Sequence, residues 1–269
     1  MNAKHIGLMI ALLIGGHSLQ AQVAAPARPP VVSTADRPAI ALARRMIVDT
    51  MRALGSPGAS VCVIRNGRVI WSEAFGYADI EQQVRATPQT MFRIGSVSKA
   101  LTSAALGVLI DQGKVDLDAE VQRYVPSFPP KKYPVTVRQL AGHLGGIRHY
   151  NGREFWIQQH YNSVLDALSI FKDDSLLFEP GTRYSYSSYG WNLISAVIEN
   201  ASGEPFLDVM RKTVFMPAGL THTRPEFADS IIPFRARFYT WADSLHTMLN
   251  APYVDNSYKW AGGGFMSTA

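Results

Sequence analysis

Ser96 and Lys99 are the two residues best suited to chemistry in this chain of 269 residues. Positions three apart share one face of a helix, so the serine hydroxyl and the lysine amine would touch there. A serine hydroxyl becomes nucleophilic when a base takes its proton, and an amine acts as that base only when it is neutral. The pKa of a free lysine is about 10.4, so burial or a neighbouring cation has to lower it. The spacing therefore indicates a nucleophile with its base.

The Ser-x-x-Lys spacing is not specific by itself, since about one match is expected by chance in a chain of this size. A second match at Ser169 and Lys172 lies in a segment that is typical of an amphipathic helix. Ser96 differs because the run 91–96 comes after a predicted hairpin and directly before a strong helical pattern. The N-terminus of a helix offers backbone N–H groups to a developing oxyanion. The context therefore favours Ser96.

A tyrosine-rich segment far downstream offers a second base. It runs from Tyr184 through Tyr186 to Tyr189, after Pro180-Gly181 and ahead of a helical pattern. A phenol on a loop before a helix can exchange a proton with a lysine. Packing of these rings in the core is the alternative, and the residue types alone favour that alternative.

The elements that must position these residues form a mixed pattern. Apolar residues at helical spacing predict a helix over 40–54, and two β-rich runs around Asn66-Gly67 predict a hairpin. A further helix is expected from Ser98 to Gly113. Other helices are expected at 135–140, 163–171, 191–200 and 206–214, and a late strand at 234–241. This order predicts an α+β fold whose hairpin needs further strands.

Composition excludes several classes of protein. With 47% hydrophobic and 17% charged residues, the chain is typical of a globular protein. The net charge of +5 comes from scattered Lys and Arg without a basic run among aromatics, which argues against nucleic-acid binding. Cys62 is the single cysteine, so an internal disulfide is impossible. His143, His149 and His160 lack a carboxylate pattern, so no metal site is expected.

The beginning of the chain is typical of a secretory signal. A short basic start, an apolar run over 6–14 and small residues up to Ala25 predict a signal peptide over 1–25. The alternative is a membrane anchor, but the run is shorter than the roughly 20 apolar residues that span a bilayer. Prolines predict a linker over 26–38, followed by one domain over 39–269. We therefore expect a periplasmic or secreted protein that is not integral to the membrane.

Several runs together resemble the serine β-lactamase and penicillin-binding-protein superfamily, from about residue 57 to the end. Residues 92–99 are similar to its nucleophile motif, 140–147 to its His-x-x-Gly-Ile turn, and Tyr186-Ser187-Ser188 to its Tyr-x-Asn element. Residues 236–239 and 252–265 resemble the mitochondrial β-lactamase-like proteins and their bacterial relatives, within the class C and esterase-like branch. The resemblance implies a β-lactamase/transpeptidase-like fold, with an antiparallel sheet, flanking helices and a mostly helical subdomain.

The same resemblance implies acyl transfer. Ser96 would attack a carbonyl, with Lys99 as base or proton relay. Tyr186 would share the proton with Lys99 and activate the leaving group or the water that removes the acyl group. The Ser96 N–H would bind the oxyanion, Ser188 would contact substrate, and His143 would be a hydrogen-bonded turn residue. No metal or organic cofactor is implied. Gly262-Gly263-Gly264 suggests a close backbone approach near the site.

The chain departs from the family pattern in two ways. Ser188 stands where the family usually has Asn, and its shorter side chain argues against strong degradation of β-lactam antibiotics. No Lys/His-Thr/Ser-Gly strand follows Tyr186. We therefore expect a C-terminally truncated member that lacks the last sheet strands, with an open edge on the first hairpin.

These observations predict a secreted serine hydrolase acting on a small-molecule or peptide substrate, with peptidase-like or esterase-like work on an amide or ester. One alternative is a non-catalytic scaffold that keeps the fold. Another is a cell-envelope peptide-binding protein, which the positive charge would attract to anionic polymers. The sequence does not give the oligomeric state.

Overall fold

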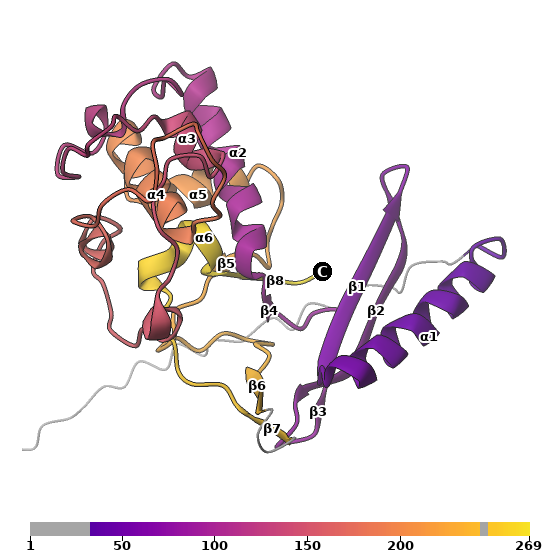
Figure 1. Cartoon of the computed structure of the whole chain (residues 1–269). Helices are drawn as coiled ribbons and strands as arrows, with labels where there is room; N and C mark the ends of the chain where they lie inside the picture. The colour runs from indigo at the N-terminus through magenta and orange to yellow at the C-terminus, as the bar shows by residue number, and fades with distance from the viewer. Residues whose placement is uncertain (1–32, 243–246) are drawn as a thin grey trace, which may run out of the picture.

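A long helix and a β-hairpin form one side of the structure, a computed structural model that describes residues 33–242 and 247–269 (Figure 1). Helix α1 (Arg37–Leu54) ends at Gly55, whose left-handed φ of 62° closes the last turn. Strands β1 (Gly58–Arg65) and β2 (Arg68–Asp79) pair antiparallel around Asn66-Gly67, with φ of 51° and 72°. Positive φ at both turn residues fits a tight hairpin, so the predicted helix and hairpin are confirmed.

Three small antiparallel sheets make up the β-structure. The first has the order β1-β2-β3, with β3 at Val84–Arg85, so β1 is an edge strand among the described residues, as expected. The second is β4-β8-β5, formed by Phe92–Arg93, Phe265–Ser267 and Arg224–Pro225. The third pairs β6 (Tyr239–Ala242) with β7 (Thr247–Asn250). Since β8 lies between β4 and β5, a segment near residue 266 fixes the strand that leads to Ser96.

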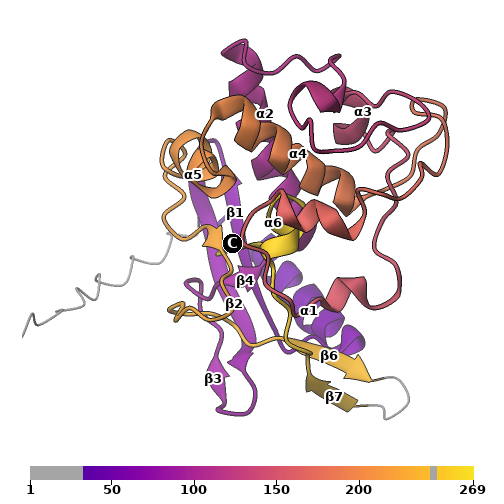
Figure 2. The same ribbon diagram turned by 90° about the vertical axis from the view of Figure 1, so that its left-hand side faces the viewer.

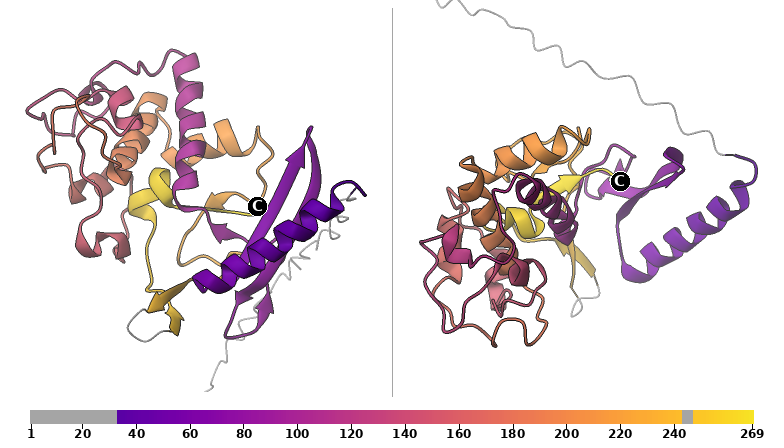
Figure 3. Two further views of the ribbon diagram at one scale, coloured as in Figure 1. Left: turned by 45° about the vertical axis from the view of Figure 1, so that its right-hand side comes forward. Right: turned by 90° about the horizontal axis from the view of Figure 1, so that it is seen from above.

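A mostly helical body forms the other side of the structure (Figure 3). Its α-helices are α2 (Ser98–Asp111), α3 (Val137–Ala141), α4 (Ser188–Ser202), α5 (Phe206–Met210) and α6 (Trp260–Gly263). A π-helical turn, Arg211–Phe215, extends α5. Short 3-10 turns occupy Gly95–Val97, Val121–Arg123, Gly152–Trp156, Asp166–Ile170 and Ser257–Lys259. The fold is therefore α+β, with antiparallel sheets and a helical body, as predicted.

The helices that carry the site residues are anchored in the main core. Helix α4 packs against α2, and both pack against α6 (Figure 2). Residues 188–198 of α4 are all buried. The largest apolar side chains of this core include Leu109, Leu193, Ile194, Phe206 and Phe265. Burying a side chain of this size contributes about 1.5–3 kcal/mol, so the relative positions of α2, α4 and α6 are strongly determined.

Two predicted elements are corrected by the structure. The helix expected at 163–171 is a 3-10 turn over Asp166–Ile170. Ser163 accepts from the Asp166 N–H, and the Ser169 hydroxyl donates to the Asp166 carbonyl, so side chains compete with α-helical bonding. The strand expected at 234–241 begins only at Tyr239. Phe234 has a φ of 60°, which interrupts an extended backbone.

The predicted signal peptide over 1–25 lies outside the described residues, as do 26–32 of the predicted linker. Helix α1 begins within the last two linker positions. Within 33–242 and 247–269, none of the helices combines the length and apolar character needed to cross a bilayer.

Gly76 in β2 lies in close backbone contact with Pro57, the residue that precedes β1. Its φ is 69°, and a Cβ there would lie 2.1 Å from the Pro57 carbonyl oxygen. We predict that Gly76→Ala lowers the free energy of unfolding by about 3 kcal/mol or more, since strain and a backbone clash add. Urea unfolding measures the change.

Gly67→Ala is the matched control for this substitution. Gly67 has a similar φ of 72° but open space around the Cβ position. It should cost only about 1 kcal/mol, the strain of a left-handed alanine. Equal losses in the two variants would contradict the backbone clash at Gly76.

Candidate active site

Ser96 lies at the entrance to α2 with its side chain open to solvent. Strand β4 is tied to β8, and the Ile94 N–H donates to the Phe265 carbonyl at 3.1 Å. The chain then turns through Gly95, which has a φ of 50°. Ser96 follows in the short 3-10 turn, and α2 starts two residues later. The turn therefore exposes the Ser96 hydroxyl at the N-terminal end of a 14-residue helix.

The structure brings Ser96, Lys99 and Tyr186 together. Lys99 Nζ donates to Ser96 Oγ at 3.2 Å, from one turn further along the helix. The Tyr186 hydroxyl donates to the same Ser96 oxygen at 2.7 Å, from 90 positions away in the sequence. The Ser96 hydroxyl thus meets a phenol and an amine, which are the two groups expected to handle its proton.

Lys99 is held by hydroxyl and carbonyl oxygens from three segments. Besides Ser96 Oγ, Nζ donates to Ser188 Oγ at 3.1 Å and to the Gly262 carbonyl at 2.6 Å. The residue is only 7% exposed, and no ion pair of the described residues includes it. Burial lowers the pKa of the Lys99 amine below the ordinary lysine value, although Tyr186 acts in the opposite direction. The amine is therefore easier to deprotonate than that of a free lysine.

The pKa of the Tyr186 phenol is also lowered. Burial raises its pKa, but its contacts with Lys99 and Ser96 lower the pKa more, so the balance lies below the ordinary tyrosine value. Lys99 Nζ lies 4.8 Å from the centroid of the Tyr186 ring. Two groups this close titrate as a pair, and a proton removed from Ser96 can reside on either of them.

The tyrosine-rich segment divides between the core and the site. Tyr189 is fully buried and stacks on Phe171, with ring centroids 4.6 Å apart. Tyr186 is 36% exposed, and Tyr184 is 67% exposed. Core packing therefore describes Tyr189, whereas Tyr186 faces Ser96.

Ser188 is the first residue of α4 and is 3% exposed. Its hydroxyl accepts from Lys99, so in this structure it contacts the amine directly. The predicted contact of Ser188 with substrate stays a prediction. The glycine run approaches this point closely, as expected, because a Cβ on Gly262 would lie 3.2 Å from the Ser188 carbonyl oxygen.

Two histidines support the segment that carries Tyr186. The Ser187 N–H donates to His143 Nδ1, and the Ser188 N–H donates to His149 Nδ1, each at 3.1 Å. The sequence predicted His143 as a hydrogen-bonded turn residue, and the structure confirms it. The part played by His149 was missed, because its only signal is a position six residues after His143 on an irregular loop.

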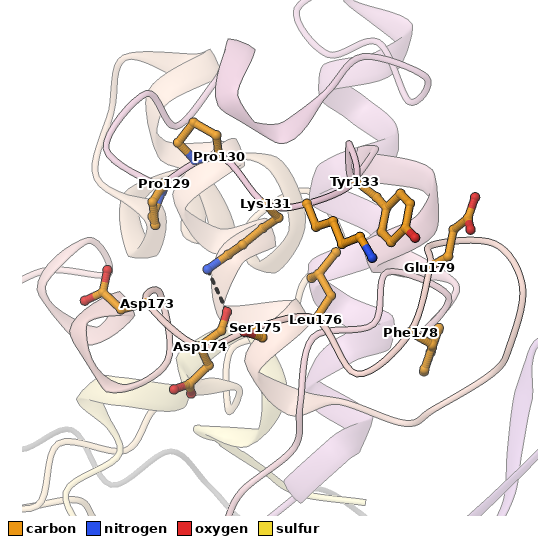
Figure 4. A pocket seen from close by; sticks show the side chains of 11 residues that line it. Pro129, Pro130, Lys131, Tyr133, Asp173, Asp174, Ser175, Leu176, Phe178 and Glu179 are labelled. Atoms are coloured by element: carbon orange, nitrogen blue, oxygen red, sulfur yellow. Dashed lines mark hydrogen bonds between the residues drawn. The ribbon is translucent and has the colours of Figure 1, made fainter.

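A separate cavity of about 510 Å³ lies away from this cluster (Figure 4). It is lined by residues of the segments 129–133 and 173–179, and none of the residues around Ser96 contributes. Lys131 reaches across it and donates to the Asp174 carbonyl at 2.8 Å and to the Lys172 carbonyl. The Lys131 amine thus links the segment 129–133 to the backbone of residues 172–174. Within the described ranges, no three His, Cys, Asp or Glu side chains are grouped to hold a metal ion.

Comparison with known proteins gives a consistent result. Residues 43–269 match the family profile described as Beta-lactamase. The human mitochondrial serine beta-lactamase-like protein LACTB is 36% identical over 284 residues, covering 80% of this chain and 52% of that protein. The chain thus spans about half the length of the curated relatives it matches.

Solved structures show the same fold. EstCE1, described as a hydrolase with promiscuous acyltransferase activity, has a TM-score of 0.72 and 26% identity, covering 88% of this chain and 71% of its own. An octameric penicillin-binding protein homologue from Pyrococcus abyssi has a TM-score of 0.73 and 25% identity. The match covers 85% of this chain and 53% of the homologue.

The lowered pKa of Lys99 has a measurable consequence for the nucleophilicity of Ser96. The rate of phosphonylation by a fluorophosphonate should be low in acid, where the amine is protonated, and should rise with pH. The midpoint should lie below about 10.4, the value of a free lysine. Intact-mass kinetics from pH 5 to 10 measure it.

Lys99→Met is the control for this pH profile. It removes the titrating amine, so the remaining rate should be low and should lack the same midpoint. A profile that is flat in the unmodified chain, or that titrates like a free lysine, would contradict the proton-accepting role of Lys99.

Proposed function

The chain belongs to the beta-lactamase family, and from that premise we propose that it is a serine hydrolase that transfers the acyl group of an amide or ester to Ser96. One observation carries the proposal: an exposed serine hydroxyl is bonded at once to a buried amine and to a phenol, at 3.2 and 2.7 Å. A serine in a merely structural turn needs neither partner.

In the proposed acylation, the neutral Lys99 amine accepts the proton of Ser96 as Oγ attacks the carbonyl carbon. The oxygen of the tetrahedral intermediate becomes negative and is stabilised by the Ser96 N–H at the start of α2. Tyr186 then gives its proton to the departing alcohol or amine, and the proton held by Lys99 passes to Tyr186. The products are an ester on Ser96 and a protonated leaving group.

Deacylation reverses the direction of the proton. Water attacks the ester carbon and loses a proton to the Lys99–Tyr186 pair. That proton returns to Ser96 Oγ when the acid departs. The pair suits both steps, because the pKa of each member lies below its ordinary value and either group can give up its proton more readily.

The proposed substrate is a small molecule or peptide with an ester or amide bond. The similarity to EstCE1, a hydrolase with promiscuous acyltransferase activity, supports acyl transfer as the reaction class. Ser188, in place of the family's usual Asn, provides a shorter side chain for an amide substrate. We therefore place peptidase-like or esterase-like activity ahead of antibiotic degradation.

We further propose that the protein is secreted or periplasmic. This rests on the pattern of residues 1–25, which resembles a signal peptide. N-terminal sequencing of the protein recovered from culture medium or periplasm tests it. Recovery in the cytosol with Met1 retained would contradict it.

The catalytic assignment is tested by labelling and turnover on the purified chain. A fluorophosphonate and a penicillin should each be offered to the chain and to Ser96→Ala, with intact-mass detection. We expect a single fluorophosphonate adduct that Ser96→Ala loses. Turnover of a p-nitrophenyl ester should fall by about 10²–10⁴ in Tyr186→Phe, the usual contribution of a general acid–base group.

Ser169→Ala is the matched control, because Ser169 belongs to the other Ser-x-x-Lys match and its hydroxyl donates to the Asp166 carbonyl. It should label and turn over like the unmodified chain. A thermal melt establishes that each sample is folded. A folded chain without an adduct would overturn the enzyme and favour a non-catalytic scaffold.

A further inference from the structure

The segment Tyr186-Ser187-Ser188 is hydrogen-bonded through its backbone to two histidine side chains. The first N–H groups of a helix have no partner within it, and Ser187 and Ser188 stand at the start of α4. His143 and His149 supply these partners from a loop more than 35 residues earlier in the chain. Each bond fixes the backbone within two residues of Tyr186.

The same two rings also confine the side chain of Tyr186. The His143 ring lies 4.4 Å from the Tyr186 ring at 32°, and the His149 ring lies 5.5 Å away at 86°. His143 therefore lies tilted against the phenol ring, and His149 meets that ring edge to face. The same pair thus holds the backbone next to Tyr186 and borders the Tyr186 ring.

We infer that His143 and His149 are positioning residues that work as two neutral acceptors and align the Tyr186 hydroxyl with Ser96. This deepens the proposed function, since it concerns the same site. The hydrogen bonds from the Ser187 and Ser188 amides to the two rings are present whether or not the chain is an enzyme.

The neutral state of both rings follows from the hydrogen bonds. A nitrogen that accepts an N–H carries no proton, so Nδ1 is bare and Nε2 holds the ring proton. Burial, followed by the nearby Lys99, lowers the pKa of both rings; His149 adds to the effect on His143, which a backbone hydrogen bond with Ser187 opposes in part. Both histidines are therefore neutral at pH 7.

The groups that face these rings offer no anion to an imidazolium. They are Lys99 from α2, Tyr184 and Tyr186 from the following loop, Tyr150 beside His149, and Trp191 from α4. In the ion pairs of the described residues, the histidine that meets a carboxylate is His160, with Asp255. Protonation would turn each acceptor into a donor that opposes a backbone N–H.

The consequence falls on the 2.7 Å bond between Tyr186 and Ser96. When Nδ1 is protonated, the Ser187 and Ser188 amides lose their acceptors and the segment is released. A displacement of about 1 Å at a reacting group can lower a rate by about 100-fold. The two histidines stabilise this arrangement fully above the ordinary histidine pKa of about 6.5, and that stabilisation is lost as the pH falls from there through their depressed pKa values.

Asparagine is the substitution that isolates this role. Its Oδ1 occupies the place of Nδ1, accepts an N–H and does not titrate in this range. It also tolerates the φ of 60° at His143. The test variant is therefore the double substitution His143→Asn, His149→Asn. His149→Ala removes one acceptor at a position whose φ is not positive.

Amide hydrogen exchange of Ser187 and Ser188 is the direct measurement, corrected for the intrinsic rate at each pH. In the unmodified chain, protection should fall by about threefold to tenfold between pH 7.5 and 5, the worth of one hydrogen bond. The double Asn variant should keep its protection at pH 5, and His149→Ala should lose that of Ser188 at both values. Unchanged protection in the unmodified chain, or equal loss in the double variant, overturns the inference.

The pH profile of fluorophosphonate labelling is the functional arm. Loss of one proton from the Lys99–Tyr186 pair gives a slope of about one in log rate against pH. Below about pH 6.5, two further protonations should steepen the slope in the unmodified chain, while the double Asn variant keeps the slope of one. The same steepening in both variants overturns the inference. Absence of any labelling counts against the proposed function, and the exchange measurement still decides the role of the histidines.

Discussion

The environment of the Lys99 amine is the constraint on which the site depends. Lys99 is only 7% exposed, so its amine avoids an unpaired buried donor only where protein oxygens surround it. These oxygens are Ser96 Oγ from the 3-10 turn before α2, Ser188 Oγ from α4 and the Gly262 carbonyl from α6. Separating any of the three segments would leave a buried donor unpaired, so the chemistry and the packing of the helical body have the same geometric requirement.

This requirement explains the residues around the amine. A Cβ on Gly262 would crowd the Ser188 carbonyl oxygen at 3.2 Å. Because glycine has no Cβ, the backbone of α6 can approach α4 closely, and the Gly262 carbonyl reaches Lys99. Strand β8 follows α6 directly and pairs with β4, so the segment that fixes the amine also fixes the strand before Ser96. The nucleophile and its base are thus located by one C-terminal segment, from residue 260 to 267.

The predictions that failed had a common physical cause. Apolar spacing at 163–171 suits a helix, but serine hydroxyls there bond to the backbone and leave a 3-10 turn. The run at 234–241 has strand-forming residues, but its first part is set by the bridge between Met91 and Arg235 and by the turned backbone at Phe234. Local patterns therefore predicted the long elements well and the short segments poorly, because both short segments take their conformation from hydrogen bonds that the apolar spacing does not show.

Ser96 and Lys99 could be paired from the sequence alone, because helical spacing is local and three residues of separation fix it. The first helix, the hairpin around Asn66-Gly67 and the α+β class were determined in the same way, by periodicity and turn chemistry. The approach of Tyr186 to Ser96 across 90 positions depends on how α2 and α4 pack. Tertiary structure likewise decided that His143 and His149 accept the Ser187 and Ser188 N–H groups, and that the Gly262 carbonyl reaches the Lys99 amine. Backbone groups take part in all three bonds. A backbone group has no signature in the sequence, and its direction is set only when distant segments fold together.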